Sequence, residues 1–358
     1  MSHLSGILLV DCPASALNNA GTDAGTRTEN VVTVKKIKTK AGTFPYVSAQ
    51  AFRYWLREGL RGVEGWKPSP VYREAKIAYT DANPIEYAED DLFGYMRAQS
   101  KKSDAVKDRA EKDILKAATP VETDVTLTRS SVLRTSTLIS IAPSEPVLDF
   151  GVMARHEGNP VPHEHEFYRT TLTGLFSVDL RMLGRFYHVD RTGYKHLDSV
   201  RRKLAEERGL AAYDNDRAYE LPLPERKARL TQLLLGLAQI TGGAKLALHY
   251  TDVSPRLLMM AVAKGGNHLF GTTVSGDNRG LPRINTAAIE EVARVYKDAL
   301  ISRIHIGLTQ GYLDDQRGDI EECLKKISGP GSASISHPVE AINNLIAELE
   351  TKAGEWLA

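Results

Sequence analysis

The sequence contains few cysteines, and their placement excludes two kinds of stabilised protein. Only Cys12 and Cys323 occur among the 358 residues, and they stand far apart. Two isolated cysteines build neither a disulfide framework nor a paired-cysteine zinc site. They are typical of a reducing compartment, so we expect a cytoplasmic protein.

Long apolar runs are also missing. No stretch approaches the roughly 20 apolar residues of a membrane-spanning helix. Residues 1–12 combine a short apolar run with no basic flank, which is unlike a signal peptide. We therefore expect no membrane partner.

Neither sign of charge dominates. The net charge of +1 excludes a uniformly basic coat, but it leaves room for a local basic groove. Residues 35–61 hold a single acid, Glu58, whereas acids crowd the C-terminal part at Asp314, Asp315, Asp319, Glu321 and Glu322.

The acid-poor region holds the most regular pattern of the chain, a helix predicted to begin near Ser48. One side carries Phe52, Trp55, Leu56 and Leu60, and another carries Gln50, Arg53, Arg57 and Arg61. No acid within this arginine stripe offsets the like charges. We expect an anion there, bound by arginines and by the helix N-terminus, with Lys35, Lys36 and Lys38 extending the track. A solvated face with Ser48 as an ordinary N-cap is the alternative.

The order of strand and helix patterns predicts an α+β fold. Strands are expected at 4–10, 31–38, 126–141, 167–186, 245–250 and 257–263. Helices are expected from Ser48, over 225–240 with a cap at Gly242-Gly243, and at 289–300 and 339–356. The order is compatible with β-α-β-β-α-β, a ferredoxin-like (RRM) antiparallel sheet.

Two regions interrupt this order. Residues 63–120 lose periodicity and include a charged, helical segment at 101–116, which predicts a helical insertion. Residues 143–165 are rich in proline, glycine and histidine and predict a projecting hairpin or loop. Residues 13–25 predict a loop.

Three other patterns invite a chemical interpretation. His163 and His165 lack the H-E-x-x-H spacing and a third ligand, so a polar hairpin arm is favoured. The glycine-rich run at 265–280 lacks the G-K-[ST] of a P-loop and predicts turns. Asp11, Asp23 and Asp81 leave a metal-dependent ribonuclease open, with Asp23 the first to test.

Four segments, in this order, carry a resemblance to a known family. They are PYVSAQAFRYWLR (45–57), DLFGYM (91–96), SVLRTSTLIS (131–140) and EFYRTTLTGLFSVDL (166–180). Together with Gly242-Gly243, they make the chain resemble the backbone subunit of CRISPR Cascade complexes. The resemblance is to its type I-B form, the DevR-like group of the RRM-fold RAMP superfamily.

The resemblance implies a hand-shaped subunit. An RRM-like palm (1–62 and 121–358, with C-terminal helices) carries a helical finger (63–120) and a β-hairpin thumb (149–167). Copies polymerise along the guide RNA (crRNA) and hold it for pairing with a target DNA strand in antiviral defence. The implied partners are a 5′-end capping subunit, a repeat-processing endoribonuclease, a large subunit and a recruited helicase-nuclease. The last of these cuts DNA, so this chain is expected to be a non-catalytic scaffold without a cofactor.

The resemblance also implies RNA-contacting residues. Ser48, Gln50, Arg53 and Arg57 match the positions that contact the RNA backbone, and the thumb adds Met153, Arg155, His156 and Arg169. The stacking aromatics of RRM signatures are not evident, so sequence-neutral backbone binding is expected. Two alternatives remain: a metal-dependent endoribonuclease on the same fold, and a nucleic-acid-binding regulator that acts without a guide.

Overall fold

The computed structural model describes residues 2–21, 31–73, 77–98, 119, 125–155, 157–191, 193–327 and 335–358. The segment predicted to be helical at 101–116 lies outside these ranges, as do Asp23 and His156.

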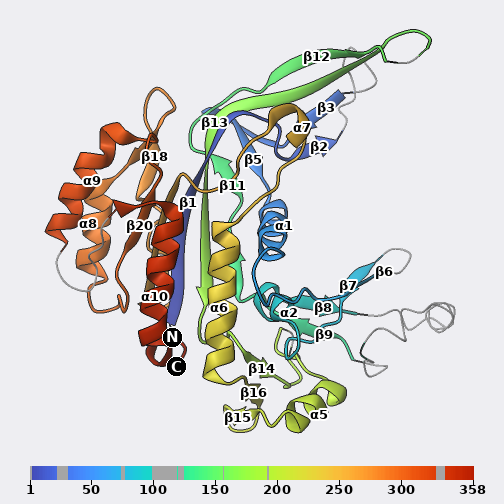
Figure 1. Cartoon of the computed structure of the whole chain (residues 1–358), viewed down its shortest axis with the longest axis vertical. Coiled ribbons are helices and arrows are strands. Elements are labelled where there is room, and N and C mark those ends of the chain that lie inside the picture. Colours follow the sequence, from blue (N-terminus) through green and yellow to red (C-terminus); the bar gives the residue numbers. More distant parts are fainter. Residues whose placement is uncertain are drawn as a thin grey trace.

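One large sheet forms the middle of the molecule (Figure 1). Its path runs through β21 (Ile335–Ser336), β20 (His305–Leu308), β17 (Leu257–Lys264), β1 (Ser2–Ser15), β13 (Val161–Asp179), β11 (Leu138–Ser140), β5 (Gly42–Val47) and β4 (Lys36–Thr39). Beside this path, β13 also pairs with β10 (Leu133–Thr135), β12 (Val147–Met153) and β3 (Val31–Val34), and β3 pairs with β2 (Asn19–Gly21). Most of these pairs are antiparallel, and β20–β21 and β13–β3 are parallel. The protein is therefore α+β with an antiparallel-dominated sheet.

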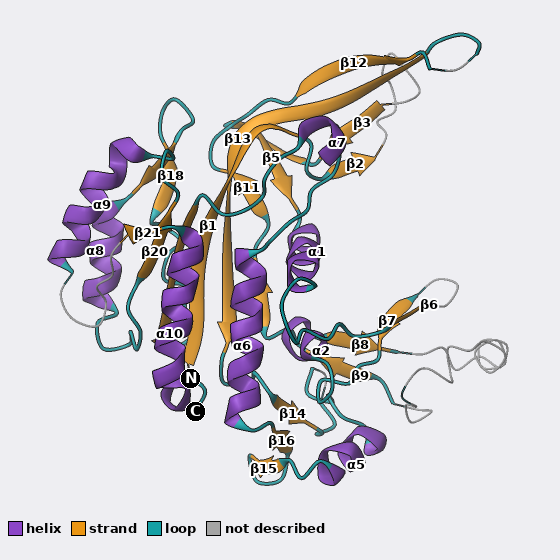
Figure 2. Cartoon of the chain, viewed as in Figure 1, coloured by secondary structure: helices purple, strands orange, loops and turns teal. Residues whose placement is uncertain are grey.

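Helices cover both faces of this sheet (Figure 2). The first core lies under α1 (Ala49–Leu60), α6 (Leu223–Ala238) and α10 (Pro338–Trp356). The second lies under α8 (Thr286–Val295) and α9 (Asp314–Lys326). In β1, Leu8 and Val10 point into the first core, and Ile7 and Leu9 point into the second. Because both faces are covered, β1 is an almost continuous apolar run.

Helix α1 begins as its sequence predicts. The Ser48 hydroxyl accepts a hydrogen bond from the Ala51 backbone N–H at 3.3 Å, which caps the first turn. Its buried side is the predicted one, with Phe52, Trp55, Leu56 and Leu60. Gly59 allows α1 to approach α6 closely, because a Cβ there would lie 2.6 Å from the Gly236 carbonyl oxygen.

Shorter elements fill the rest of the described chain. Between α1 and β10 lie β6 (Val71–Arg73), β7 (Ala78–Thr80), α2 (Ala88–Phe93), β8 (Tyr95–Arg97) and β9 (Leu127–Arg129). A second group follows β13: β14 (Arg185–Tyr187), α5 (Ser199–Glu207), β15 (Ala211–Tyr213) and β16 (Ala218–Glu220). The last are α7 (Leu246–His249), β18 (Val274–Gly276) and β19 (Pro282–Ile284).

A long hairpin projects from the sheet at the top of Figure 1. Strand β12 pairs with the first part of β13 from Val147–Phe167 to Met153–Val161. The hairpin falls where the proline, glycine and histidine content predicts one. Its polar arm includes His163 and His165, as expected.

Several local predictions are wrong. Residues 245–250 form the single turn α7 instead of a strand, held between the left-handed residues Lys245 (φ 53°) and Tyr250 (φ 35°). The alternation of apolar and polar residues at 245–250 wrongly predicted a half-buried strand, because the apolar side chains of α7 stay largely exposed. Helix α6 ends at Ala238, before the two glycines. The loop expected at 13–25 is partly strand, since β1 reaches Ser15 past a bulge and β2 follows.

Candidate nucleic-acid interface

The first arginine of the predicted stripe on α1, Arg53, is bound inside the protein, whereas Arg61 is 68% exposed. Arg53 donates to the Ser131 hydroxyl (3.0 Å) and to the carbonyl oxygens of Leu133 (2.8 Å) and Phe93 (2.6 Å). Burial, followed by the charge of Arg57, lowers the pKa of Arg53 to about 10. The guanidinium of Arg53 therefore ties α1 to α2 and β10.

Arg57 has an acidic partner that the local sequence does not reveal. Its Nε lies 2.7 Å from the Glu89 carboxylate, and its guanidinium stacks 4.1 Å from the centre of the Phe93 ring. The expectation of an unbalanced stripe is wrong for this reason, since α2 supplies the acid. Arg57 still has 33% of its side chain exposed, and its contact with RNA stays a prediction.

The basic strand residues differ in how they are engaged. Lys36 pairs with Glu166 of β13, which also accepts from the Val34 backbone N–H at 3.0 Å. Within the described residues, Lys35 and Lys38 make no ion pair, and Lys38 is exposed. Gln50 is exposed on the first turn of α1. Lys35, Lys38 and Gln50 are therefore among the accessible polar groups at this end of the sheet.

The hairpin presents an unusual surface. Met153 is 59% exposed and Arg155 is exposed at the far end. Large apolar side chains are exposed along both faces of the ribbon, namely Val147, Leu148, Phe150, Val152, Met153 and Val161. Several large apolar side chains exposed together on one ribbon are typical of an interaction site.

Two histidines dock α7 against the base of the hairpin. The Nε2 atoms of His165 and His249 lie 3.1 Å apart, and Asp149 Oδ2 lies 3.7 Å from His165 Nε2. Burial and then the charge of Lys245 lower the pKa of both rings. Across the described ranges, no group of three or more histidine, cysteine or acidic residues has the geometry to hold a metal ion.

The two candidate catalytic acids within the described ranges, Asp11 and Asp81, have different surroundings. Asp81 is buried, accepts from the backbone N–H and hydroxyl of Thr119 (2.9 and 2.6 Å), and faces Arg97. Its carboxylate is occupied by structural partners. Asp11 lies partly exposed in a cleft of about 370 Å³, together with Arg169, Arg279, Arg283 and Tyr312. This cleft brings Arg169 near cations that sequence reasoning did not identify.

A buried ion network explains the DLFGYM segment. The Asp91 carboxylate is fully buried, pairs with Arg129, and lies 2.7 Å from Arg229 Nη1. It also accepts from the Gly184 N–H at 2.9 Å. Gly94 follows with φ 69°, where a Cβ would lie 2.4 Å from the Arg129 carbonyl oxygen. These residues join α2 to β9 and α6.

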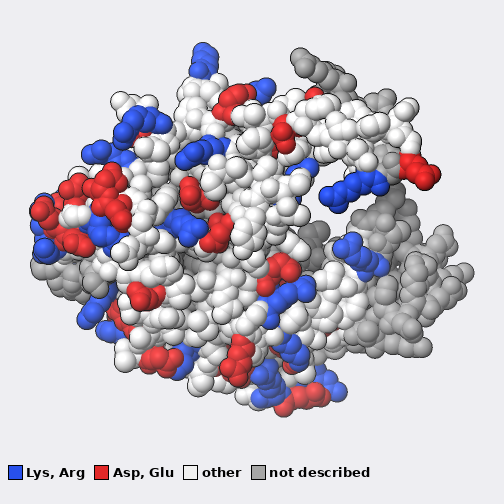
Figure 3. All heavy atoms as spheres, turned by 45° about the horizontal axis from the view of Figure 1, so that its top comes forward, with Lys and Arg blue, Asp and Glu red and all other residues white. Residues whose placement is uncertain are grey.

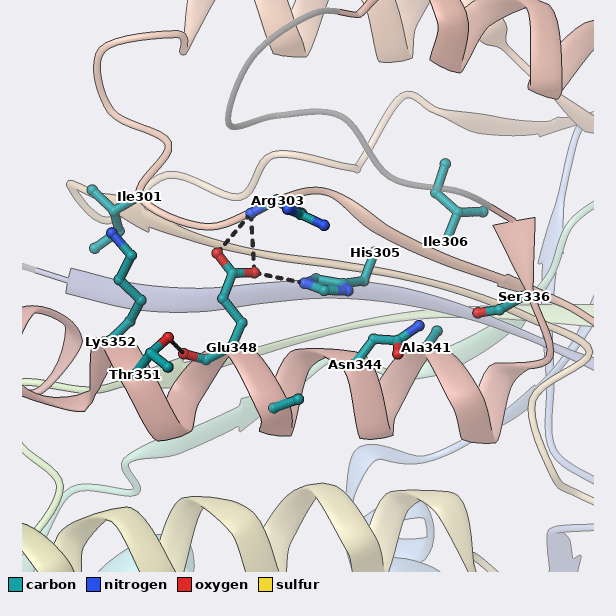
Figure 4. Close-up of a pocket in the computed structure, with 11 residues that line it drawn as sticks. Ile301, Arg303, His305, Ile306, Ser336, Ala341, Asn344, Glu348, Thr351 and Lys352 are labelled. Atoms are coloured by element: carbon teal, nitrogen blue, oxygen red, sulfur yellow. Dashed lines mark hydrogen bonds and ion pairs between the residues drawn. The ribbon is translucent and has the colours of Figure 1, made fainter.

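A groove of about 680 Å³ lies at the β20 edge, at the end of the sheet remote from β4. Figure 4 shows Glu348 of α10 turned toward β20, where it accepts from the Arg303 N–H at 3.3 Å and lies 2.9 Å from His305 Nε2. The Glu348 carboxylate is thus bound to residues at and just before β20.

Charge is unevenly spread over the surface. In Figure 3 acidic side chains gather at the left, the side on which α9 lies in Figure 1. The first turn of α9 contains Asp314 and Asp315, in agreement with the acidic C-terminal part of the sequence. No helix among the described residues is both long and apolar enough to span a membrane.

Comparisons with known proteins give one family and a set of similar structures. The model of a family described as "CRISPR-associated negative auto-regulator DevR/Csa2" matches residues 9–267. A chain of a "CRISPR RNA-guided surveillance complex" has 13% identity and a TM-score of 0.53, with 97% of this chain and 99% of that chain covered. A chain of a "CRISPR RNA-guided surveillance complex, pre-nicking" has the same identity and coverage and a TM-score of 0.50. The comparison with curated proteins found no match.

Proposed function

Because the chain belongs to the CRISPR-associated DevR/Csa2 family, we propose that it is the non-catalytic crRNA-binding backbone subunit of a CRISPR Cascade surveillance complex. Copies of the chain assemble side by side along the guide RNA and hold it for pairing with a target DNA strand in antiviral defence. We assign it to a type I-B complex in the cytoplasm. The other partners in this proposal are the capping, processing and large subunits and the recruited helicase-nuclease.

The order of the central strands supports a ferredoxin-like palm. The sequence β17-β1-β13-β11 is antiparallel throughout, with α1 on the connection from β1 toward β11 and α6 on the connection from β13 to β17. This order supports the proposal of a β-α-β-β-α-β unit. In the proposal residues 1–62 and 121–358 are the palm, 63–120 the finger and 149–167 the thumb.

The projecting hairpin is the observation that carries the assembly proposal. Leu148 and Phe150 are 48% and 59% exposed on alternate positions of β12, and Val147 and Met153 expose the other face by 56% and 59%. A two-stranded ribbon with apolar side chains on both faces is marginally stable alone in water. A neighbouring copy bound to the same RNA would cover it.

The accessible cations and the exposed Gln50 support RNA as the ligand that aligns these copies. Lys35, Lys38, Gln50 and Arg169 would contact the backbone directly, and Lys36, Ser48 and Arg57 would contribute from partly engaged positions. Arg53 would act by positioning α1. The non-catalytic part of the proposal is supported by Asp81, whose carboxylate is buried under structural partners.

The proposal is tested by measuring how many copies bind RNA of increasing length. Mass photometry of the purified chain on single-stranded RNA should give complexes that grow by whole copies as the RNA lengthens. The double variant Leu148→Ser/Phe150→Ser should bind RNA but lose stepwise growth, because a polar hairpin gains little from burial. Val339→Ser, which changes an apolar residue of α10 that is 39% exposed, is the matched control. Single copies on RNA of every length would contradict the proposal.

The family description favours one second candidate. The words "negative auto-regulator" fit a nucleic-acid-binding regulator that acts without a guide. That candidate predicts tight binding of a particular duplex DNA and no growth on single strands. The same titration with duplex DNA therefore separates the two functions.

A further inference from the structure

Within the residues that the structure describes, no helix packs on one part of a face of the large sheet, and this part carries aromatic side chains. In this region Tyr46 of β5 pairs with Ile139 of β11, which pairs with Thr173 of β13, so the three side chains form one row. Phe44 lies two residues before Tyr46 and therefore on the same face. The alternate residues Val47, Leu138 and Leu172 belong to the core under α1 and α6.

Among the described elements, the second layer of helices stops short of this face. Helices α8 and α9 cover β1, β17 and β20, and their core reaches only as far as Leu175 and Ile141. Phe44, Tyr46 and Ile139 belong to neither core and are half-buried. Ile37, which is opposite Phe44 on β4, is 40% exposed.

Cations stand on both sides of the aromatic row. The Lys35 carbonyl accepts from the Tyr46 N–H at 2.9 Å, which places Lys35 beside Tyr46 at the outer edge. Arg169 stands four residues before Thr173 on β13, shares its face by alternation, and is exposed. Neither cation makes an ion pair with any residue in the described ranges. Cations and aromatic rings on one sheet face fit a polyanion that carries flat bases.

We propose that Phe44 and Tyr46 form a stacking platform for bases of the guide RNA, with Lys35 and Arg169 binding the phosphates on either side. The inference rests on the proposed function and adds base contacts to it. Aromatic rings on an open sheet face stack unpaired bases without reading their sequence. The segment that follows the platform, Val47 to Ser48, leads into the N-terminus of α1, so the platform adjoins the predicted backbone contacts.

The test separates stacking from charge by their different responses to salt. The probe is a labelled single-stranded RNA of mixed sequence and about 12 nucleotides, within the span that such sites bind. Phe44→Leu and Tyr46→Leu should each weaken binding about tenfold without changing the slope of log affinity against log salt. Lys35→Ala should reduce that slope by about 1. Tyr46→Phe should retain the affinity of the unchanged protein, since the ring remains.

Two controls keep the outcome unambiguous. Tyr219→Leu alters a half-buried tyrosine on β16, at the other end of the molecule, and should leave RNA affinity unchanged. An abasic strand of the same length loses the stacking contacts with both rings, so it should bind the unchanged protein more than about tenfold more weakly than the base-carrying strand. This result needs no variant to fold. Equal binding of the two strands, or full affinity in folded Leu variants, would overturn the platform while leaving the scaffold function in place. No RNA binding by the unchanged protein would overturn the proposed function itself.

Discussion

At the scale of single residues, Arg53 shows how a binding pattern and a structural brace look alike in sequence. A helix stripe of arginines predicts an anion-binding face. In the folded chain, the terminal nitrogens of Arg53 donate hydrogen bonds to two backbone carbonyls and a hydroxyl. The acceptors come from residues 93 to 133, so no local pattern reveals them.

Removal of the Arg53 hydrogen bonds should lower the stability of the fold. Arg53→Ala leaves the carbonyls of Phe93 and Leu133 without their donors, so the free energy of unfolding should fall by about 2–3 kcal/mol. Arg61→Ala is the matched control on the same stripe. Its side chain is 68% exposed, and its loss should change the free energy by less than about 0.5 kcal/mol. Urea denaturation measures both. Equal midpoints for the two variants, with RNA affinity lost only in Arg53→Ala, would make Arg53 an RNA contact instead.

At the scale of elements, the histidine pair makes the docking of α7 on the hairpin sensitive to pH. The pKa values of His165 and His249 lie below the ordinary 6.5 in the folded protein, because burial and Lys245 oppose protonation. The undocked rings therefore bind protons at a pH where the docked rings do not. Docking is at full strength above pH 6.5 and weakens as the pH falls below it. The charges facing the pair are Asp149, Lys245 and His163.

Hydrogen exchange of α7 checks this prediction. Once corrected for the intrinsic rate, exchange at 246–250 should be faster at about pH 5.5 than at about pH 7.5. His249→Phe keeps an aromatic ring beside Phe167 and should reduce the difference, because only His165 of the pair then titrates. Protection of α7 that does not change with pH in the unchanged protein would contradict the account.

At the scale of the whole molecule, elements with strong local signals were predictable and their contacts were not. Helix α1, the long α6 and the hairpin follow from periodicity and from proline and glycine placement. Strand-like alternation at 245–250 misled because left-handed residues at both ends fold the segment into a turn. Helix α9 was not predicted, since its polar sequence buries only Ile320, Cys323 and Leu324.

The candidate site was predictable only in part, for a related reason. The lysines near Val34 and the residues of the hairpin could be located from the sequence. The internal partners of Arg53 and Arg57, and the open face beside Tyr46, depend on strand order within the sheet. That order brings the β4–β5 hairpin beside β11 and β13, which are distant from it in sequence.

The central claim is that this chain holds a guide RNA, and its most direct test is the nucleic acid that accompanies it. The protein would be purified at low salt from cells that carry its CRISPR array, and the bound RNA extracted and sequenced. We predict repeat-flanked spacer RNA of uniform length. A folded protein that carries no RNA, or only short cleaved fragments, would contradict the account.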